Sequence, residues 1–531
     1  MGLISTITDA WAAVTKPIRT IGRDMTQAIL GNNKPVWPPE ADAPRLSRYR
    51  QYRKLYEGEQ KDFFTKQGFK QANPNRPYIC VNLLGGTADL LATRAYGEGF
   101  TVDTPEAPAP AAAEGEEATA APVNVTQDFI EHVIAESGLQ MEAYDQAVKG
   151  LYRGDKAYKV IYSAADNAEQ VIVQALDPGI VFPEWDTLND SRLVAANIDQ
   201  KIEVDDKHVY LWRERHELRG EESWVVNKLF RLDKSGSGDN AEFYFDPVAD
   251  EVPLETLEAT AGLVPETSTG IDALLVVFQR GTSIFTPALL SLQGEFNHLT
   301  TQKSHLFDKH LPATMAGPKP TETAKDDEGN VDLDKMRYLA VESGGTMPVT
   351  LLEWTAAGFA QADEHLRNIL TGFAFTAGVD LSALLPHEGQ AAASGTALRR
   401  QQMKTQGTVA GVQKHDEPSL KRVFSVCTKL GAIKPIAWDG GTPEALEMAQ
   451  ITVTFGDGLP PDRQEDVKEQ VDRYLAGMQS LAAALMVLDG LTQEQAAERA
   501  QAILEEQRAG QPEPPQVQVA SPFATVIPGA Q

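Results

Sequence analysis

Three residues with the chemistry of a hydrolase lie close together in a segment rich in Gly, Pro, Ala and Ser: His387, Glu388 and Ser394. A serine nucleophile activated by a histidine base is one way to hydrolyse an ester or amide. The nucleophile-elbow pattern Gly-x-Ser-x-Gly is missing, so an exposed loop explains these residues better. We therefore expect no enzyme activity, and a hydrolase using residues 387–394 is kept only as an alternative.

A second group of reactive side chains is acidic and comprises Asp326, Asp327, Glu328, Asp332 and Asp334. Their order does not match a calcium loop, which needs Gly at its sixth position and Glu at its twelfth. The chain also lacks a Gly-rich phosphate loop, a His-Glu-x-x-His motif and a Cys-x-x-Cys motif. We expect a solvated acidic turn here, and neither a metal nor a cofactor in the protein.

The elements that position these residues are three helical patterns between residues 281 and 430. In the first, apolar residues recur at spacings of three and four, and Lys303 occupies the one seam position that is not apolar. A helix from Thr286 to His310 would be on the order of 37 Å long. The apolar positions are Leu289, Leu292, Phe296, Leu299 and Leu306.

The second pattern follows a Pro, Gly and acid-rich excursion over residues 311–355. It places a run of apolar residues from Phe359 to Phe373 on one helical face. A third helical run starts at Thr396, and its regularity is interrupted near Pro418. A rod that extends out and back has little contact with its own chain, so neighbouring copies, arranged as a ring, are expected to supply its packing.

The residues before this stretch predict a mixed α+β region. Helices are predicted at 46–56, which is basic and rich in Tyr, at 82–94 and at 129–151, and residues 104–123 are predicted to be a disordered loop. Strands are predicted in the Val, Ile and aromatic-rich runs 158–162, 171–176, 208–218, 224–232 and 243–245. Beyond the central stretch, a short strand at 451–455 precedes helical patterns up to residue 507.

Composition limits the classes of function. A chain of 531 residues is too long for one hydrophobic core. A net charge of −27 argues against a protein that wraps nucleic acid, although DNA in transit stays possible past a wall that binds it weakly. Two cysteines, Cys80 and Cys427, are too few for a disulfide framework, and no apolar run is long enough to span a membrane.

Several segments together resemble the portal proteins of tailed bacteriophages, most closely the SPP1-type and actinobacteriophage portals. The resemblance covers roughly residues 49–507 and depends on the order and spacing of its motifs. These motifs are LYRGDKAYKVIY, QALDPGIVFPEWD, GTSIFTPALLSLQGEFNHLTTQ, ASGTALRRQQMK, LPPDRQEDVKEQVDRYLAGMQ and GLTQEQAAERAQAILEEQ.

The resemblance implies a portal fold with a mixed α/β wing, a long helical stem, a small α/β clip and a helical crown. The implied boundaries are an N-terminal arm at 1–46, the wing at 47–280, stem helices at 281–310 and 356–378, the clip at 311–355, a tunnel loop at 379–395, a long helix and wing return at 396–459, the crown at 460–508 and a disordered tail at 509–531.

The resemblance also implies a role. Twelve copies would form a ring at one capsid vertex, through which double-stranded DNA is packaged and ejected. The ring would be assembled in the bacterial cytoplasm and would bind the large terminase subunit, head-tail adaptors, and the major capsid and scaffold proteins, with no membrane partner. Another oligomeric head or tail scaffold is the alternative.

In such a ring two sets of residues are expected to face DNA. Lys303, Lys309 and His310 lie towards the far end of the first rod, where rings of cations would touch phosphates without reading bases. Solvated or ion-pairing roles are equally compatible with each of these cations alone. In the tunnel loop the expected residues are Pro386, His387, Glu388, Gly389, Gln390 and Ser394.

Overall fold

The computed structural model describes the chain in segments. They are residues 34–69, 77–104, 124–163, 169–205, 207–236, 242–310, 314–317, 337–340, 350–352, 356–385, 402–434, 436, 438, 446, 450–456, 458, 463–489 and 493–509. The chain divides into a large unit, residues 1–389 with 401–458, and a small unit, residues 390–400 with 459–531.

The largest sheet of the large unit has eight strands in the order β1-β9-β8-β7-β6-β5, with β10 and β11 also paired to β8. Every strand pair in it is antiparallel. The strands are β1 (Val36–Trp37), β5 (Val181–Trp185), β6 (Leu193–Glu203), β7 (Val209–Arg219), β8 (Glu222–Ser235), β9 (Glu242–Tyr244), β10 (Glu251–Val252) and β11 (Glu266–Ser268). A short 3-10 helix, η3 (Leu254–Thr256), lies between the last two.

Two smaller antiparallel sheets lie in the same unit. One has the order β12-β3-β4, built from β12 (Val276–Gln279), β3 (Lys156–Ser163) and β4 (Gln170–Leu176). The other pairs β16 (Thr452–Phe455) with β2 (Phe100–Asp103), so that the end of the large unit returns beside a strand from its beginning.

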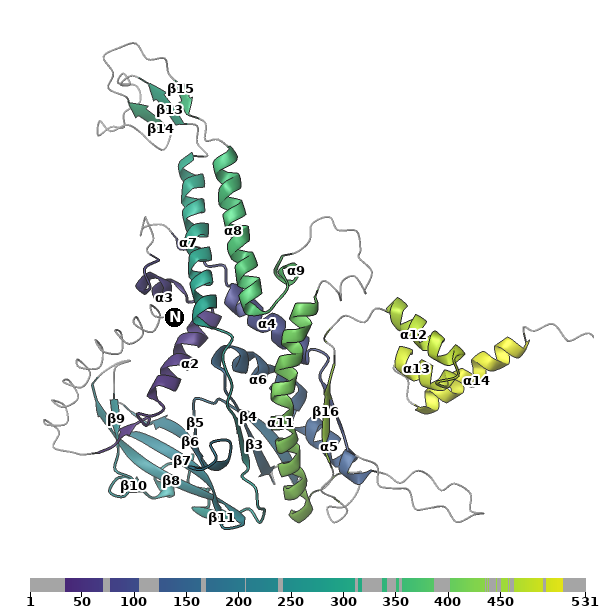
Figure 1. The fold of residues 1–531 in the computed structure, drawn as a ribbon. Coiled ribbons are helices and arrows are strands. Elements are labelled where there is room, and N and C mark those ends of the chain that lie inside the picture. The colour runs from purple at the N-terminus through teal and green to yellow at the C-terminus, as the bar shows by residue number, and fades with distance from the viewer. Residues whose placement is uncertain are drawn as a thin grey trace, which may run out of the picture. The chain divides into compact units, whose positions relative to one another are not determined.

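Helices cover these smaller sheets and enclose the main core, as Figure 1 shows. They are α2 (Ala43–Tyr56), α3 (Lys61–Lys66), α4 (Leu83–Tyr96), α5 (Val125–Glu136), α6 (Leu139–Arg153) and α11 (Met403–Ile433). Asn82 and Asn124 begin α4 and α5 by accepting a hydrogen bond from a backbone N–H of the first turn. The core contains fully buried Phe129, Phe285 and Phe424 from three distant parts of the sequence.

The structure corrects three of the predicted elements. The single helix predicted over 129–151 is two helices, because Gly138 between them has a φ of +57°, a left-handed conformation that ends α5. The third helical run is not interrupted near Pro418, since α11 continues through it. Burial of Leu420 and Val423 just beyond the proline offsets the lost backbone hydrogen bond.

The third correction is a missed strand. β6 lies between β5 and β7 inside the main sheet, yet its sequence LVAANIDQKIE has little of the Val, Ile and aromatic enrichment used to find strands. Its buried polar residues, Asn197 and Asp199, are satisfied by neighbouring side chains. The strand could be recognised only with its neighbours in place.

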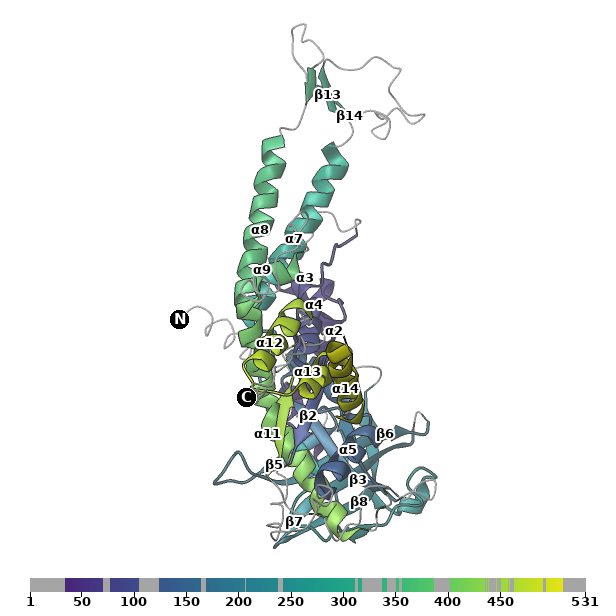
Figure 2. The ribbon, with the colours of Figure 1, turned by 90° about the vertical axis from the view of Figure 1, so that its right-hand side faces the viewer.

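Two long helices, α7 (Pro287–His310) and α8 (Ala356–Ala377), pack against each other and run side by side in Figures 1 and 2. Between them in sequence is a three-stranded sheet of β13 (Thr314–Gly317), β14 (Arg337–Ala340) and β15 (Thr350–Leu352), in the order β14-β13-β15. β13 pairs parallel with β14 and antiparallel with β15. A short helix, α9 (Leu381–Leu384), follows α8.

The small unit is helical in the part that the structure describes. It contains α12 (Arg463–Leu475), α13 (Leu481–Asp489) and α14 (Gln493–Ala509), and α13 packs against both of the others. The protein as a whole has a mixed α+β fold. None of the helices in the described segments combines the length and the apolar character needed to cross a membrane.

Candidate functional site: the α7–α8 hairpin and its anchors

Lys303 lies where α7 faces α8, and its Nζ donates a hydrogen bond to Asp363 Oδ1 on α8. The residue that interrupts the apolar seam of α7 therefore cross-links the two helices with an ion pair. Lys309 and His310 are in the last turn of α7, but the structure does not describe their side chains. Contact of these three residues with DNA remains a prediction.

The six residues predicted in the tunnel loop, Pro386, His387, Glu388, Gly389, Gln390 and Ser394, lie outside the described residues. The hydrolase alternative depends on the same segment, so it also stays untested. Among the residues that the structure describes, no three His, Cys, Asp or Glu side chains are grouped so that they could bind a metal.

The start of this predicted loop is bound to the first turns of α11, which lie beyond its end. Asp380, just before α9, accepts hydrogen bonds at Oδ2 from Thr405 N and Oγ1, both at 2.9 Å, and the Asp380 N–H donates to Thr405 Oγ1 at 2.8 Å. One turn further along α11, Thr408 Oγ1 donates to Gly378 O at 2.6 Å. The chain therefore leaves α8 and enters α11 at fixed, adjoining positions.

On α7 a ladder of buried polar side chains holds the segment that leads into α4. We call residues 77–82 the strap, and Gln293, Asn297 and Thr301 the ladder. The ladder residues are four apart and therefore lie on one face of α7. All three are at most 2% exposed, although such polar side chains usually face solvent.

Each ladder residue accepts a hydrogen bond from a backbone N–H, two of them in the strap and the third, that of Leu84, in the first turn of α4. Gln293 Oε1 accepts from Leu84 N at 3.1 Å, Asn297 Oδ1 from Val81 N at 3.0 Å, and Thr301 Oγ1 from Ile79 N at 3.0 Å. Gln293 Nε2 donates to the strap carbonyl of Val81 at 2.7 Å.

The ladder is also joined internally and to the helix α3 region. Gln293 Nε2 donates to Asn297 Oδ1 at 2.9 Å, and Asn297 Nδ2 donates to Gln60 Oε1 at 2.8 Å. The ladder was not predicted from the sequence, because polar residues opposite an apolar seam normally indicate a helix face that contacts solvent. Their exact spacing of four was the only available signal.

The entry to α7 is fixed by two glycines in contact. A Cβ added to Gly281 would lie 2.1 Å from Gly154 O, and Gly154 itself has a φ of +102°. No residue with a side chain fits at Gly281 without moving the backbone. Ser283 Oγ donates to Tyr152 O at 2.7 Å and Ile284 N to Leu151 O at 2.9 Å, so the entry segment is bonded to the end of α6.

A buried charge cluster lies beside this entry and joins four elements. Asp416 on α11 accepts hydrogen bonds from Lys156 Nζ at the start of β3, from Tyr96 OH on α4 at 2.7 Å, and from Gln279 Nε2 on β12 at 3.0 Å. Next to it, Asp155 accepts from Tyr49 OH and from Gly281 N, the latter at 3.0 Å. The long helix, both small-sheet strands and the entry to α7 are thereby tied together.

The electrostatics of the cluster agree with an ionised pair. Burial by itself would raise the pKa of Asp416, but the charge of Lys156 and the donated hydrogen bonds lower it to about 2. Burial lowers the pKa of Lys156, and Asp416 opposes that effect. The side chains of Lys156 and Asp416 are 5% and 4% exposed, so the pair is shielded from solvent and fixes the geometry of the elements around it.

A second buried polar group joins β3 to the main sheet. Glu214 on β7 accepts from Lys159 Nζ at 2.6 Å and lies 2.8 Å from His216 Nε2, and His216 is fully buried. Burial alone would raise the pKa of Glu214, but His216 and Lys159 lower it to about 2. An acid and a base lie together here without access to a substrate, so we assign them a structural role.

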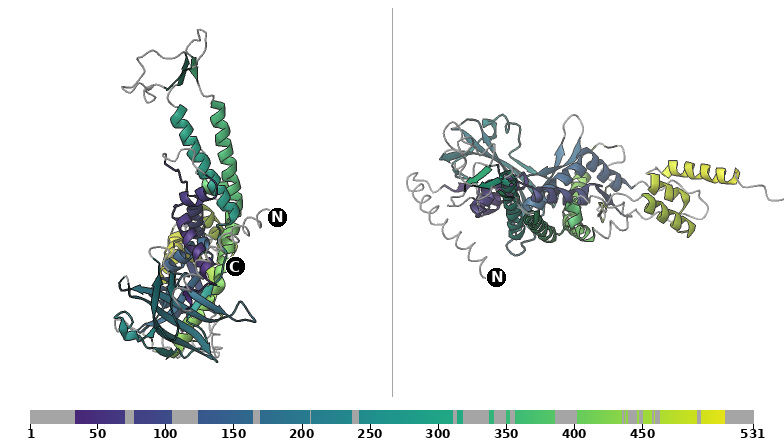
Figure 3. Two further views of the ribbon diagram at one scale, coloured as in Figure 1. Left: turned by 90° about the vertical axis from the view of Figure 1, so that its left-hand side faces the viewer. Right: turned by 90° about the horizontal axis from the view of Figure 1, so that it is seen from above.

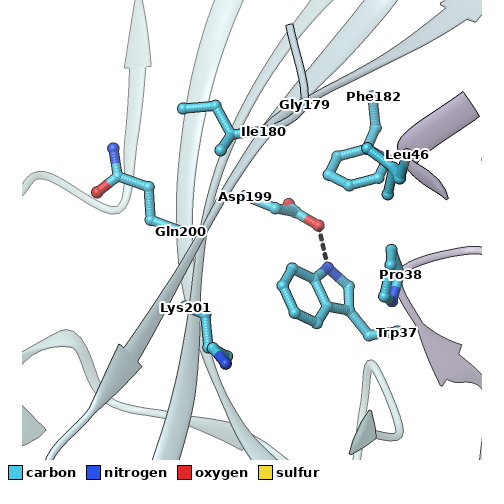
Figure 4. A pocket seen from close by; sticks show the side chains of 9 residues that line it. All are labelled: Trp37, Pro38, Leu46, Gly179, Ile180, Phe182, Asp199, Gln200 and Lys201. Carbon is cyan, nitrogen blue, oxygen red and sulfur yellow. Dashed lines mark hydrogen bonds between the residues drawn. The ribbon is translucent and has the colours of Figure 1, made fainter. Parts of the chain in front are cut away.

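The described surface has one pocket of note, about 370 Å³ in volume, between the main sheet and the start of α2 (Figure 4). Its acidic residue, Asp199, accepts from Trp37 Nε1 at 2.8 Å and binds Arg213 through both carboxylate oxygens at 2.7 Å. Apolar side chains such as Phe182 and Leu46 supply much of the remaining wall. The Asp199 carboxylate is therefore engaged by Trp37 and Arg213, which join β6 to β1 and β7.

A scan against protein-family profiles and a search of curated proteins find no match to this chain.

Proposed function

We propose that this protein is the portal protein of a tailed bacteriophage, a non-enzymatic ring of twelve copies at one capsid vertex. Double-stranded DNA would enter and leave through the ring. The large terminase subunit, head-tail adaptors, and the major capsid and scaffold proteins are its proposed partners. The function is thus that of a conduit and docking platform.

The observation that carries the proposal is the α7–α8 hairpin, whose two helices are held in different ways. The ladder fixes α7 to the strap, whereas α8 has one buried and one exposed face. The buried face includes Leu370 and Phe373, and it packs against α7. A helix pair fixed along one side and open along the other is suited to forming the wall of a channel between copies.

The exposed face of α8 has few cations, so a polyanion could move along it without binding tightly. Its exposed residues include Gln361, Glu364, His365, Arg367, Asn368, Thr371 and Phe375. They lie on one side of the helix, and Arg367 is the one Lys or Arg among them. Since tight binding to DNA depends on many cation–phosphate contacts, a surface of this kind would hold DNA weakly while it moves.

The ends of the predicted tunnel loop support the same role. A loop that contacts moving DNA needs a fixed base, and the bonds of Asp380 with Thr405 and of Thr408 with Gly378 supply one between the end of α8 and the start of α11. The three-stranded sheet between α7 and α8 is the segment proposed to dock the adaptors.

Electron microscopy and mass measurement of the purified full-length chain test this proposal. We expect closed rings with twelvefold symmetry, a central channel and a mass twelve times that of one chain. A particle that stays monomeric or dimeric across the micromolar range would overturn the proposal. Closed rings with no continuous channel would favour the alternative of another head or tail scaffold.

A further inference from the structure

Helix α2 carries an excess of positive charge that the described residues neutralise only in part. Its 14 residues include five basic side chains and no acidic one, in a protein with a net charge of −27. Arg48, Arg50 and Lys54 are exposed, and none forms a salt bridge with a described residue. We call Arg50 and Lys54 the basic face, because they are four apart and point the same way, whereas Arg48 lies on another side of the helix.

Helix α5 shows the opposite pattern. Its 12 residues contain three carboxylates and no Lys or Arg. Asp128, Glu131 and Glu136, which we call the acidic face, lie outside the helix's buried side and form no salt bridge with a described residue. The hydrogen bonds that Glu131 and Glu136 accept come from the neutral amides of Gln127 and Gln170, so their charge stays uncompensated.

The two faces lie on opposite flanks of the same body. Helix α6 packs against both α2 and α5 and separates them. Figure 1 and the right-hand view of Figure 3 place α2 and α5 on opposite sides of it. A copy with a cationic flank and an anionic flank pairs favourably head to tail, because like faces repel, and head-to-tail contacts form a ring when the rotation between copies closes.

We propose that the basic face of one copy docks on the acidic face of the next copy, and that this contact sets the direction of assembly. The inference rests on the proposed ring. The unit that carries both faces is one compact part of the chain, so each copy offers one of each.

A second copy fits the basic face better than DNA does. Three cations on one helix would neutralise only a few phosphates, and the surplus of acidic residues elsewhere in the chain repels a polyanion. A second copy instead presents, on α5, a helix with three carboxylates and no Lys or Arg.

The test is a charge swap in the full-length chain, read by mass photometry and sedimentation. Arg50→Glu with Lys54→Glu should raise the concentration needed for assembly on the order of tenfold at low salt, and less at 0.5 M salt. Glu131→Lys with Glu136→Lys should have a similar effect. All four changes together should restore assembly, because the contact is re-formed with its signs exchanged.

Arg231→Glu with Lys234→Glu is the matched control, since both residues are exposed on β8 and the change in net charge is the same. It should leave assembly unchanged. If Arg50→Glu with Lys54→Glu fails to fold by circular dichroism, the α5 pair gives the same test from the other face.

The outcomes separate this inference from the proposed function. Rings of the wild-type chain that persist in both two-residue variants would overturn the inference and leave the portal proposal standing. Failure of the wild-type chain to form rings would overturn both. If the α2 variant assembles normally but loses binding to a 30-base-pair DNA duplex, the basic face is a nucleic-acid surface and the inference is wrong.

Discussion

At the base of the α7–α8 hairpin, the side chains of Lys156 and Asp416 are 5% and 4% exposed, whereas those of Lys303 and Asp363, on the hairpin itself, are 22% and 59% exposed. Both are lysine–aspartate pairs between elements distant in sequence. The first has additional donors around the carboxylate, and the second faces water. Because the pair at the base is buried, its charges fix how the elements there are arranged. The pair on the hairpin is exposed, so its charges constrain α7 and α8 less.

The largest effect is expected from breaking the buried pair. Lys156→Met leaves the Asp416 carboxylate without its cation and should lower the free energy of unfolding by about 3–5 kcal/mol. Urea unfolding followed by tryptophan fluorescence measures the loss. Adding Asp416→Leu should recover part of it, because no buried charge then remains. A loss under about 1 kcal/mol would mean that water reaches the pair.

The buried carboxylate of Glu214 should make stability fall in acid. Its folded pKa, about 2, lies below the ordinary value of 4.5, so its contribution is complete above pH 4.5 and is lost as pH falls towards 2. The shift corresponds to about 3 kcal/mol. Glu214→Gln should therefore be costly at pH 6 and much less so at pH 3.

The control for this acid test is Glu221→Gln, at an exposed turn residue. Its effect on the free energy of unfolding should be the same at the two pH values. A cost of Glu214→Gln that does not change between pH 6 and pH 3 would contradict the assignment.

The neutral ladder lies between the two extremes. Asn297→Leu leaves the backbone N–H of Val81 without its acceptor and should cost about 1–3 kcal/mol. Hydrogen exchange of the peptide that contains the strap should also accelerate. Ser291→Ala, at an exposed position of α7, should change stability by less than about 0.5 kcal/mol. Unchanged exchange in Asn297→Leu would show that the ladder does not hold the strap.

The smallest effect on stability is expected at the exposed pair. Lys303→Met should change the free energy of unfolding by about 0–1 kcal/mol, and a double-mutant cycle with Asp363→Asn should give a coupling in the same range. If Lys303 faces DNA in the proposed ring, Lys303→Glu should reduce genome packaging while rings still form. Normal packaging with that variant would refute the DNA contact.

Helices and strands whose residue pattern lies within the element itself could be predicted from the sequence. The apolar spacing from Leu289 to Phe296 predicted α7, and the Val, Ile and aromatic enrichment of β7 and β8 predicted those strands. β6 was missed because its central position, and not its composition, makes it a strand.

The contacts that define the candidate site were beyond local signals. Lys156 and Asp416 are 260 residues apart, and nothing in either neighbourhood marks them as partners. The prediction for Lys303 identified an unusual position but could not name Asp363, since that depends on how α7 and α8 are aligned. The ladder could not be predicted for a related reason, because the strap that covers it lies more than 200 residues away in sequence.

A cysteine in the strap can report chemically whether the strap is attached to α7. Cys80 lies in it, half-buried, with its Sγ 3.9 Å from Asn297 Nδ2, and burial raises the pKa of its thiol. Cys427 on α11 is fully buried, and its thiol pKa is raised much further. Because thiolates are the reactive form, Cys80 would react with a thiol reagent each time the strap detaches, whereas Cys427 would react only on global unfolding.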